Sequence, residues 1–169
     1  KNSIDRALSS FERRDFSISQ RRIVWADTFE LIEEHFWLGV GPGNYELFLP
    51  AHRSVTRHRA WKELMGERTQ VAFRAHNEYL EVLAESGIFG LAALLWLLGT
   101  MLWVGYRFLK TQADDDSTSR AITSSCLAGL VATLVHSLFS FNLQDPTSAA
   151  HFWLLGGLLV AVNKGREDK

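Results

Sequence analysis

Apolar residues are concentrated in the second half of the chain, in three runs separated by short polar connections. Residues 88–106 contain no charged side chain, and residues 121–141 and 147–162 form two further runs. About 20 mostly apolar residues cross the hydrocarbon core of a bilayer as a helix. We therefore predict about three transmembrane helices within residues 88–163, the last of which Pro146 opens as a favourable first-turn residue.

Three tryptophans favour a membrane over the alternative, which is a soluble helical bundle with very apolar core helices. Trp96, Trp103 and Trp153 lie within the apolar runs or near their ends, as aromatic residues at membrane interfaces do. We expect an all-α membrane protein. The chain does not begin with Met and its first residues are polar, so we expect a fragment of a larger polytopic helical bundle.

The first half of the chain has a different pattern, which predicts a helical region outside the membrane over residues 1–87. Residues 21–36 place apolar side chains on one face and acidic ones on the other, as in an amphipathic helix. A second helix is expected over residues 77–86. Asn77 is a good N-cap for it, and Gly87 ends or bends it before the first membrane run.

Charge in the short connections predicts how the membrane helices are oriented. Lys and Arg favour the cytoplasmic side, and the connection over residues 142–149 contains none. The basic residues lie in the first loop and in the tail: Arg107, Lys110, Arg120, Lys164, Arg166 and Lys169. We therefore expect the first loop and residues 164–169 to be cytoplasmic and residues 1–87 to be periplasmic.

Composition adds little to this picture. The net charge of −1 indicates no particular partner, and the single cysteine, Cys126, excludes an internal disulfide bond. Three consecutive acidic residues, Asp114 to Asp116, resemble a metal-binding motif, but their polar neighbours favour a solvated cytoplasmic loop. We therefore predict no metal site.

Two segments of the periplasmic region could bind an anion. Residues 50–76 are rich in basic residues, which could contact pyrophosphate or an anionic sugar, or could be solvated or face lipid head groups. Residues 39–43 form a glycine turn, and Gly41 and Gly43 could cradle a phosphate or simply form a tight turn. The basic residues are Arg53, Arg57, Arg59, Lys62, Arg68 and Arg74.

His76 immediately precedes the expected helix N-terminus at Asn77. The positive end of the helix dipole and the neighbouring Arg74 both disfavour an imidazolium. A neutral imidazole near the working pH is what a general base requires. From the residues alone, a structural hydrogen-bonding role for His76 stays open beside the catalytic one.

Four segments match the pattern of one bacterial family. RRIVW, residues 21–25, has its Arg-x-x-x-Trp spacing. EEHFWLGVGPGNY, residues 33–45, is similar to its glycine turn, although Phe36 stands where proline is common. AHNEYLEVLAESGIFG, residues 75–90, has His-Asn, nine residues and Gly-x-x-Gly. HSLFSFNLQDPTSAAHFWLLGGL, residues 136–158, looks like its final helical pair. On these segments the chain, over roughly residues 17–163, resembles the O-antigen ligase and O-antigen polymerase family of membrane glycosyltransferases.

The resemblance implies transfer of a glycan from an undecaprenyl-pyrophosphate carrier to an acceptor hydroxyl at the periplasmic face of the bacterial inner membrane. The acceptor would be lipid A-core, a glycan or a protein. The reaction would be inverting, with no metal, cofactor or nucleic acid. His76 and Arg21 would be catalytic. The remaining candidates would bind pyrophosphate or glycan: Arg74, Arg53, Arg22, Arg57, Arg59, Asn77, Gly41 and Gly43.

Other functions are kept as alternatives. Within the family these are a polysaccharide polymerase and a protein O-oligosaccharyltransferase, which differ from a ligase in their acceptor. Outside it are a membrane transporter, with the basic segment as a gate, and a non-catalytic scaffold. A transporter predicts charged residues within the spans, where only His136 comes close. A scaffold predicts that Arg21 and His76 can be replaced without effect.

Overall fold

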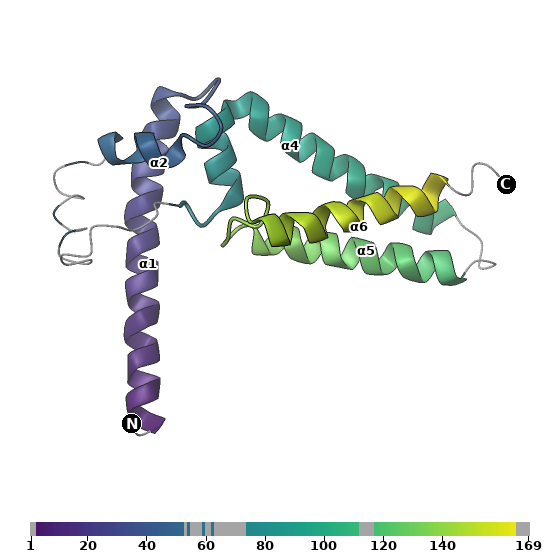
Figure 1. The fold of residues 1–169 in the computed structure, drawn as a ribbon, viewed down its shortest axis with the longest axis horizontal. Helices are drawn as coiled ribbons and strands as arrows, with labels where there is room; N and C mark the ends of the chain where they lie inside the picture. The colour runs from purple at the N-terminus through teal and green to yellow at the C-terminus, as the bar shows by residue number, and fades with distance from the viewer. Residues whose placement is uncertain are drawn as a thin grey trace. The chain divides into compact units, whose positions relative to one another are not determined.

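The computed structural model describes residues 3–52, 54, 59, 62, 74–111 and 117–164, with side chains between residues 18 and 162. Every element in these residues is helical (Figure 1), which confirms the all-α class predicted from the sequence. The elements are α1 (Ser3–Glu34), α2 (Tyr45–Phe48), the 3-10 helix η1 (Leu49–His52), α4 (Glu78–Thr111), α5 (Ser117–His136) and α6 (Pro146–Lys164).

The helices form two compact units. The first unit comprises residues 1–76 and 80–88, and the second comprises residues 77–79 and 89–169. The helix expected over residues 21–36 lies within α1, which begins much earlier, at Ser3. The helix expected over residues 77–86 and the first membrane run belong to one element, α4.

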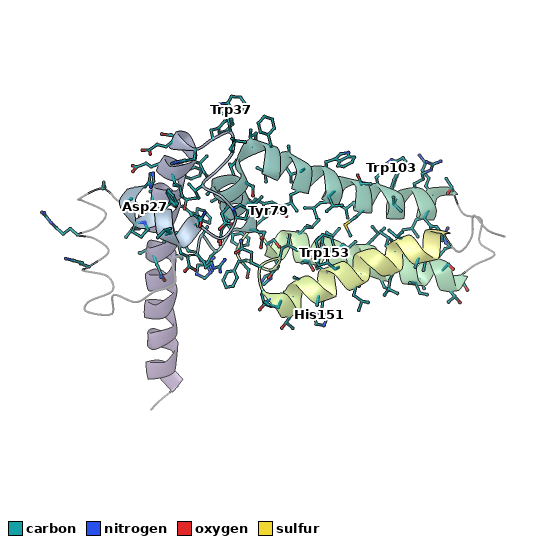
Figure 2. The ribbon with its side chains drawn as sticks, turned by 45° about the horizontal axis from the view of Figure 1, so that its top comes forward. Asp27, Trp37, Tyr79, Trp103, His151 and Trp153 are labelled. Carbon is teal, nitrogen blue, oxygen red and sulfur yellow. The ribbon has the colours of Figure 1, made fainter. Side chains whose placement is uncertain are left out.

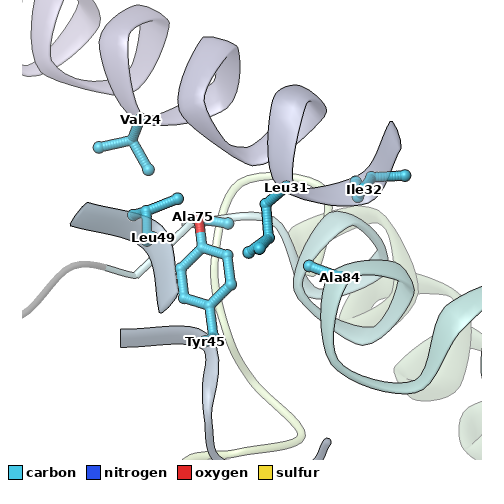
Figure 3. Packing of buried hydrophobic residues seen from close by; sticks show 7 residues of the cluster. All are labelled: Val24, Leu31, Ile32, Tyr45, Leu49, Ala75 and Ala84. Carbon is cyan, nitrogen blue, oxygen red and sulfur yellow. The ribbon is translucent and has the colours of Figure 1, made fainter. Parts of the chain in front are cut away.

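The core of the first unit lies along the apolar face of α1. Tyr45 of α2 lies between Leu31 and Leu49 in Figure 3, and its hydroxyl is 2.5 Å from Thr28 Oγ1. Because α2 and η1 are too short to be stable alone, this packing holds them in place. The buried apolar residues of the core are Val24, Leu31, Ile32, Tyr45, Leu49, Ala75 and Ala84.

Two glycines allow close backbone contact where α4 bends. Gly87 interrupts α4 with a φ of 64°, and Gly39 has a φ of 68°. A Cβ on Gly87 would lie 2.2 Å from the Trp37 carbonyl oxygen, and a Cβ on Gly39 would lie 2.3 Å from the Glu85 carbonyl. Since both glycines have a positive φ and no room for a side chain, we infer that another residue at either position would strain this bend.

The second unit is built from α4 beyond its bend, α5 and α6. Leu98 of α4, Cys126 and Leu130 of α5, and Phe152 and Leu159 of α6 form its buried core. The helices approach closely at small residues, as membrane helices commonly do. A Cβ on Gly105 would lie 2.6 Å from Leu127, and one on Gly129 would lie 2.8 Å from Leu155.

Two of these helices, α4 and α5, are long and apolar enough to cross a membrane, and α6 contains a shorter apolar helix, Pro146–Val162. Their outward surfaces carry large apolar side chains: Trp96, Trp103 and Trp153 are all at least half exposed. Trp103 points outward from α4 in Figure 2. Such surfaces are typical of helices that face lipid or other helices of a larger bundle.

Candidate active site

His76 lies in strained backbone directly before α4. Its φ of 49° is in the left-handed region, and no other non-glycine residue among those described has a positive φ. Asn77 Oδ1 accepts a hydrogen bond from the Tyr79 N–H at 3.1 Å, which is the N-cap that the sequence predicted. A non-glycine residue in this region costs about 1–3 kcal/mol and persists only where its surroundings enforce it. Such positions are frequent at functional sites.

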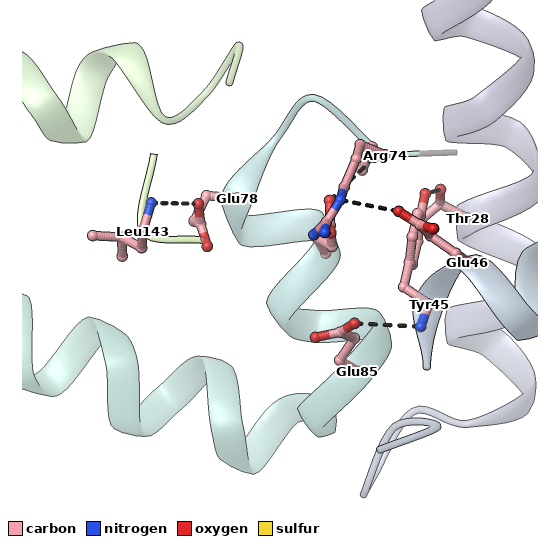
Figure 4. A network of polar contacts seen from close by, with 9 residues as sticks. Thr28, Tyr45, Glu46, Arg74, Glu78, Glu85 and Leu143 are labelled. Atoms are coloured by element: carbon pink, nitrogen blue, oxygen red, sulfur yellow. Dashed lines mark hydrogen bonds and ion pairs between the residues drawn. The ribbon is translucent and has the colours of Figure 1, made fainter. Parts of the chain in front are cut away.

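Glu81 holds the two residues that precede His76. Its Oε1 accepts a hydrogen bond from Arg74 Nη1 at 2.8 Å, and its Oε2 accepts one from the Ala75 N–H at 3.2 Å. Arg74 is also paired through Nε with Glu46 at 3.2 Å, as Figure 4 shows. The guanidinium of Arg74 is therefore shared between two carboxylates of the protein.

A further bond ties this segment to α1. Trp25 Nε1 donates to the Ala75 carbonyl at 2.7 Å. Arg21 precedes Trp25 by four residues on α1, so the two side chains lie on the same helical face. The Arg-x-x-x-Trp spacing thus brings Arg21 to the neighbourhood of His76.

Arg21 and His76 interact electrostatically. Burial and the Arg21 guanidinium lower the pKa of the His76 imidazole from its ordinary value of 6.5, with burial as the larger cause. Arg21 Nε is itself buried and has no hydrogen-bond partner among the described residues. A buried donor without a partner costs about 1–3 kcal/mol and points to a binding role when it lies beside a strained histidine.

The glycine turn donates hydrogen bonds to the backbone of α4. The Val40 N–H donates to the Ala84 carbonyl at 3.0 Å, and the Gly41 N–H donates to the Glu85 carbonyl at 2.8 Å. These bonds satisfy carbonyls where the helix is interrupted. The Gly41 N–H is thus occupied by the protein. Gly43, with a φ of 79°, has open space around it.

The structure brings none of the other described basic candidates, apart from Arg74, to His76. Arg22 and Arg59 are exposed. Arg53 and Arg57 lie outside the described residues. Among the described candidates, Arg21 is thus the arginine from a distant part of the sequence that the structure brings near His76, whereas Arg74 belongs to the same segment as the histidine.

A second cluster of polar side chains lies where α1 and η1 end. The potential metal-ligand atoms of Glu34, His35 and His52 all lie within 4.8 Å of one another. His52 Nδ1 is 2.9 Å from the Phe48 carbonyl and Nε2 is 3.1 Å from Glu34 Oε2. Both partners are hydrogen-bond acceptors, and the Glu34 carboxylate together with the two imidazoles offers the ligand types that a cation prefers.

The second unit has polar groups of its own beside α5 and α6. A hollow of about 360 Å³ is lined by residues that include His136, Asn142 and His151. His136 Nδ1 is bonded to Asn142 Oδ1 at 3.0 Å, and His151 Nδ1 to the Thr147 carbonyl at 2.7 Å. These bonds give both histidines structural partners.

Sequence reasoning missed the part played by Glu81. Glu78 and Glu81, in the first turn of α4, are almost completely buried. Glu78 Oε2 accepts the Leu143 N–H at 3.0 Å, and Glu81 binds Arg74 and Ala75. No clear signal for this contact was present in the sequence, because Arg74 lies outside the helix that carries Glu81.

Comparison with known proteins places the chain in a family. A family model described as O-antigen ligase matches residues 2–95, which include Arg21, the glycine turn and His76. The chain is 25% identical over 157 residues to the teichuronic acid biosynthesis protein TuaE of Bacillus subtilis (strain 168). That alignment covers 91% of this chain and 28% of TuaE. No solved structure matches the chain. Because the family model covers more than half of its residues, the chain belongs to the O-antigen ligase family.

Proposed function

We propose that this chain is part of an enzyme that assembles surface polysaccharide. It transfers a glycan from an undecaprenyl-pyrophosphate carrier to an acceptor hydroxyl at the periplasmic face of the bacterial inner membrane. Family membership and the teichuronic acid relative support polysaccharide assembly. The observation that carries the catalytic part is the hydrogen bond from Trp25 to the Ala75 carbonyl, which brings the face of α1 that bears Arg21 beside His76, although the two residues are far apart in the sequence.

In the proposed reaction, the acceptor oxygen forms a bond to the anomeric carbon of the glycan while the bond from that carbon to the pyrophosphate oxygen breaks. The configuration at the carbon inverts. The acceptor proton passes to the neutral imidazole of His76, and the electron pair leaves with the lipid pyrophosphate. Burial and Arg21 favour the neutral imidazole, which is the form that a general base needs.

Arg21 has the second role. Negative charge develops on the departing pyrophosphate, and a guanidinium offers several N–H donors in a plane that matches phosphate oxygens. Arg21 Nε is a buried donor that the described residues leave without a partner. An arginine in this position could do the work for which other glycosyl transferases use a metal ion, so we propose a reaction without one.

The remaining candidate residues have different proposed roles. Arg74 is paired with Glu46 and Glu81, and Asn77 caps α4, so we propose that both position His76. Arg22, Arg53, Arg57 and Arg59 are proposed to attract the anionic donor. Of the glycine turn, only Gly43 remains a proposed phosphate contact, because the Gly41 N–H binds Glu85.

Transfer of a labelled glycan from the lipid carrier, measured with the full-length protein in vesicles, tests this function. We expect His76→Ala and Arg21→Ala each to lower the rate about 10²–10³-fold without lowering insertion. Lys62→Ala, which removes an exposed basic residue of the same unit, should leave the rate unchanged. Near-normal rates in both site variants would reject the assignment and favour a transporter or a scaffold.

Two further arms of the same assay refine the reaction. A chelator should leave the rate unchanged, whereas loss of transfer that added metal restores would contradict the metal-independent mechanism and direct attention to Glu34, His35 and His52. Offering lipid A-core, a glycan end or a serine peptide as the acceptor distinguishes a ligase from a polymerase and from a protein glycosyltransferase.

A further inference from the structure

The turn that follows α1 presents three large apolar side chains on the surface. Phe36, Trp37 and Leu38 are 40%, 64% and 76% exposed. The rings of Phe36 and Trp37 meet edge to face with centroids 5.3 Å apart. Figure 2 shows Trp37 projecting away from the ribbon. Consecutive exposed residues of this size mark an interaction surface more often than a water-facing loop.

The backbone of this turn is bonded to the start of the first membrane run. The Ile88 N–H donates to the Phe36 carbonyl at 2.9 Å. Gly87 approaches the Trp37 carbonyl so closely that a Cβ would lie 2.2 Å from its oxygen. Residues 88–106 carry no charge, so Ile88 marks the level at which the chain enters the hydrocarbon. The turn is fixed at that same level.

We propose that Phe36, Trp37 and Leu38 form an interfacial anchor, with their side chains in the boundary between head groups and acyl chains of the leaflet that α4 enters. The partner is the lipid surface itself. Tryptophan suits this depth, because its ring is apolar and its N–H can reach water or a head group. The anchor extends the lipid-facing surface of the span by a second, separate segment of chain.

The polar groups around the anchor suit this depth. Exposed backbone N–H and C=O groups are costly in hydrocarbon, but the Gly39 N–H donates to the His35 carbonyl at 2.8 Å, and the next two N–H groups of the turn bind α4. Glu33 and Glu34, directly before the turn, are exposed and stay on the water side. The anchor is therefore shallow and does not span.

The anchor has a consequence for the site, and this consequence alone rests on the proposed function. Gly87 follows His76 by eleven positions along a mostly helical segment, and at about 1.5 Å per residue this keeps the two within roughly 17 Å of each other. A site so close to the anchor stays within reach of a pyrophosphate in the head-group layer. The acceptor hydroxyl must then come to the membrane surface.

Depth-dependent fluorescence quenching tests the anchor without reference to activity. Full-length protein with one cysteine in place of Leu38, and its other cysteines replaced, is labelled with an NBD fluorophore. It is then inserted in vesicles of phosphatidylethanolamine and phosphatidylglycerol. We expect a blue-shifted emission that lipids nitroxide-labelled near the head group quench and aqueous iodide does not. Leu47→Cys is the matched control, because Leu47 of α2 is 75% exposed but its N–H donates to the Asn44 carbonyl within its own segment.

Each other outcome contradicts the anchor. Quenching at position 38 by iodide alone would place the turn in water. Protection from both quenchers would mean that protein, such as another part of the full-length chain, covers it. Equal lipid quenching at positions 38 and 47 would mean that exposed apolar residues of this unit enter the lipid wherever they lie. The hydrogen bond between Ile88 and Phe36 would then not set the depth of the turn. Normal glycan transfer in the labelled protein would show that the proposed function is unaffected by any of these outcomes.

Discussion

The carboxylate of Glu81 is buried, and burial alone would disfavour its charged form. Burial raises the pKa of Glu81, while the Arg74 guanidinium and the Ala75 N–H lower it. The partners that offset the burial are the two residues directly before His76. A change at Glu81 therefore reaches His76 through the backbone, although the two side chains have different roles.

We expect Glu81→Gln to lower glycan transfer at least about tenfold and stability by about 1–3 kcal/mol, the range for a lost charged hydrogen bond. The amide keeps the size of the side chain but removes its charge. Glu85→Gln is the control, because Glu85 lies one turn later and binds the Tyr45 N–H at 3.3 Å, away from His76. Transfer rates and thermal melting of the full-length protein measure both effects. Equal losses of transfer in the two variants would argue against a positioning role.

His76 should give transfer a characteristic dependence on pH. Its pKa lies below 6.5 because of burial and Arg21, so we expect the rate to stay level at pH 7 and to fall only as the pH drops below 6.5. Arg21→Gln removes the second cause, so the midpoint of its residual activity should move up toward 6.5. A pH profile of both proteins checks this, and an unchanged midpoint would contradict the electrostatic pairing.

The same shift affects stability. The folded state favours neutral His76, so the unfolded chain binds more protons between the lowered pKa and 6.5. The stability that His76 contributes is therefore fully present above pH 6.5 and is lost as the pH falls through the folded-state pKa. His76→Ala should remove this part of the acid sensitivity, which melting temperatures across that pH range can follow.

At the scale of elements, α4 shows what an amphipathic pattern can and cannot predict. The uncharged stretch after Gly87 and the Asn77 cap were readable from the sequence, because apolar length and capping are local properties. The burial of Glu81 was not, because its partner Arg74 lies outside the helix. The glycine turn was recognised as a turn, but its partner, the helix end at Ala84 and Glu85, lies far along the chain.

The bend in α4 gives a prediction for the whole element. Gly87→Ala should destabilise the protein by more than about 2 kcal/mol, because alanine is strained at a φ of 64° and its Cβ would meet the Trp37 backbone. Gly99→Ala, in the same helix with open space around it, should be neutral or slightly stabilising. Melting of the two variants in detergent makes the comparison. Similar melting temperatures would show that the bend is not required.

At the scale of the molecule, each of the two units has a core of its own. The family resemblance predicted Arg21 and His76 as catalytic residues, but no periodicity along the chain could predict that they lie near each other, because their proximity depends on Trp25 and the tertiary packing of α1. The extent of α1 was also not predictable from its apolar face, since that face begins well after Ser3.

The orientation of the whole chain remains a prediction from its charges. A reporter that is active only in the cytoplasm should work when fused after Thr111, which follows Arg107 and Lys110, and should fail when fused after Gln144. A periplasmic reporter should give the reverse result. Activity of the cytoplasmic reporter at position 144 would invert the topology and with it the proposed periplasmic site.

The hydrogen bond from Trp25 to the Ala75 carbonyl joins the two ends of the segment formed by residues 26–74. Because this bond holds both ends of the segment beside His76, the position of the histidine depends on Trp25 and the packing of α1 rather than on the residues that lie between them along the chain.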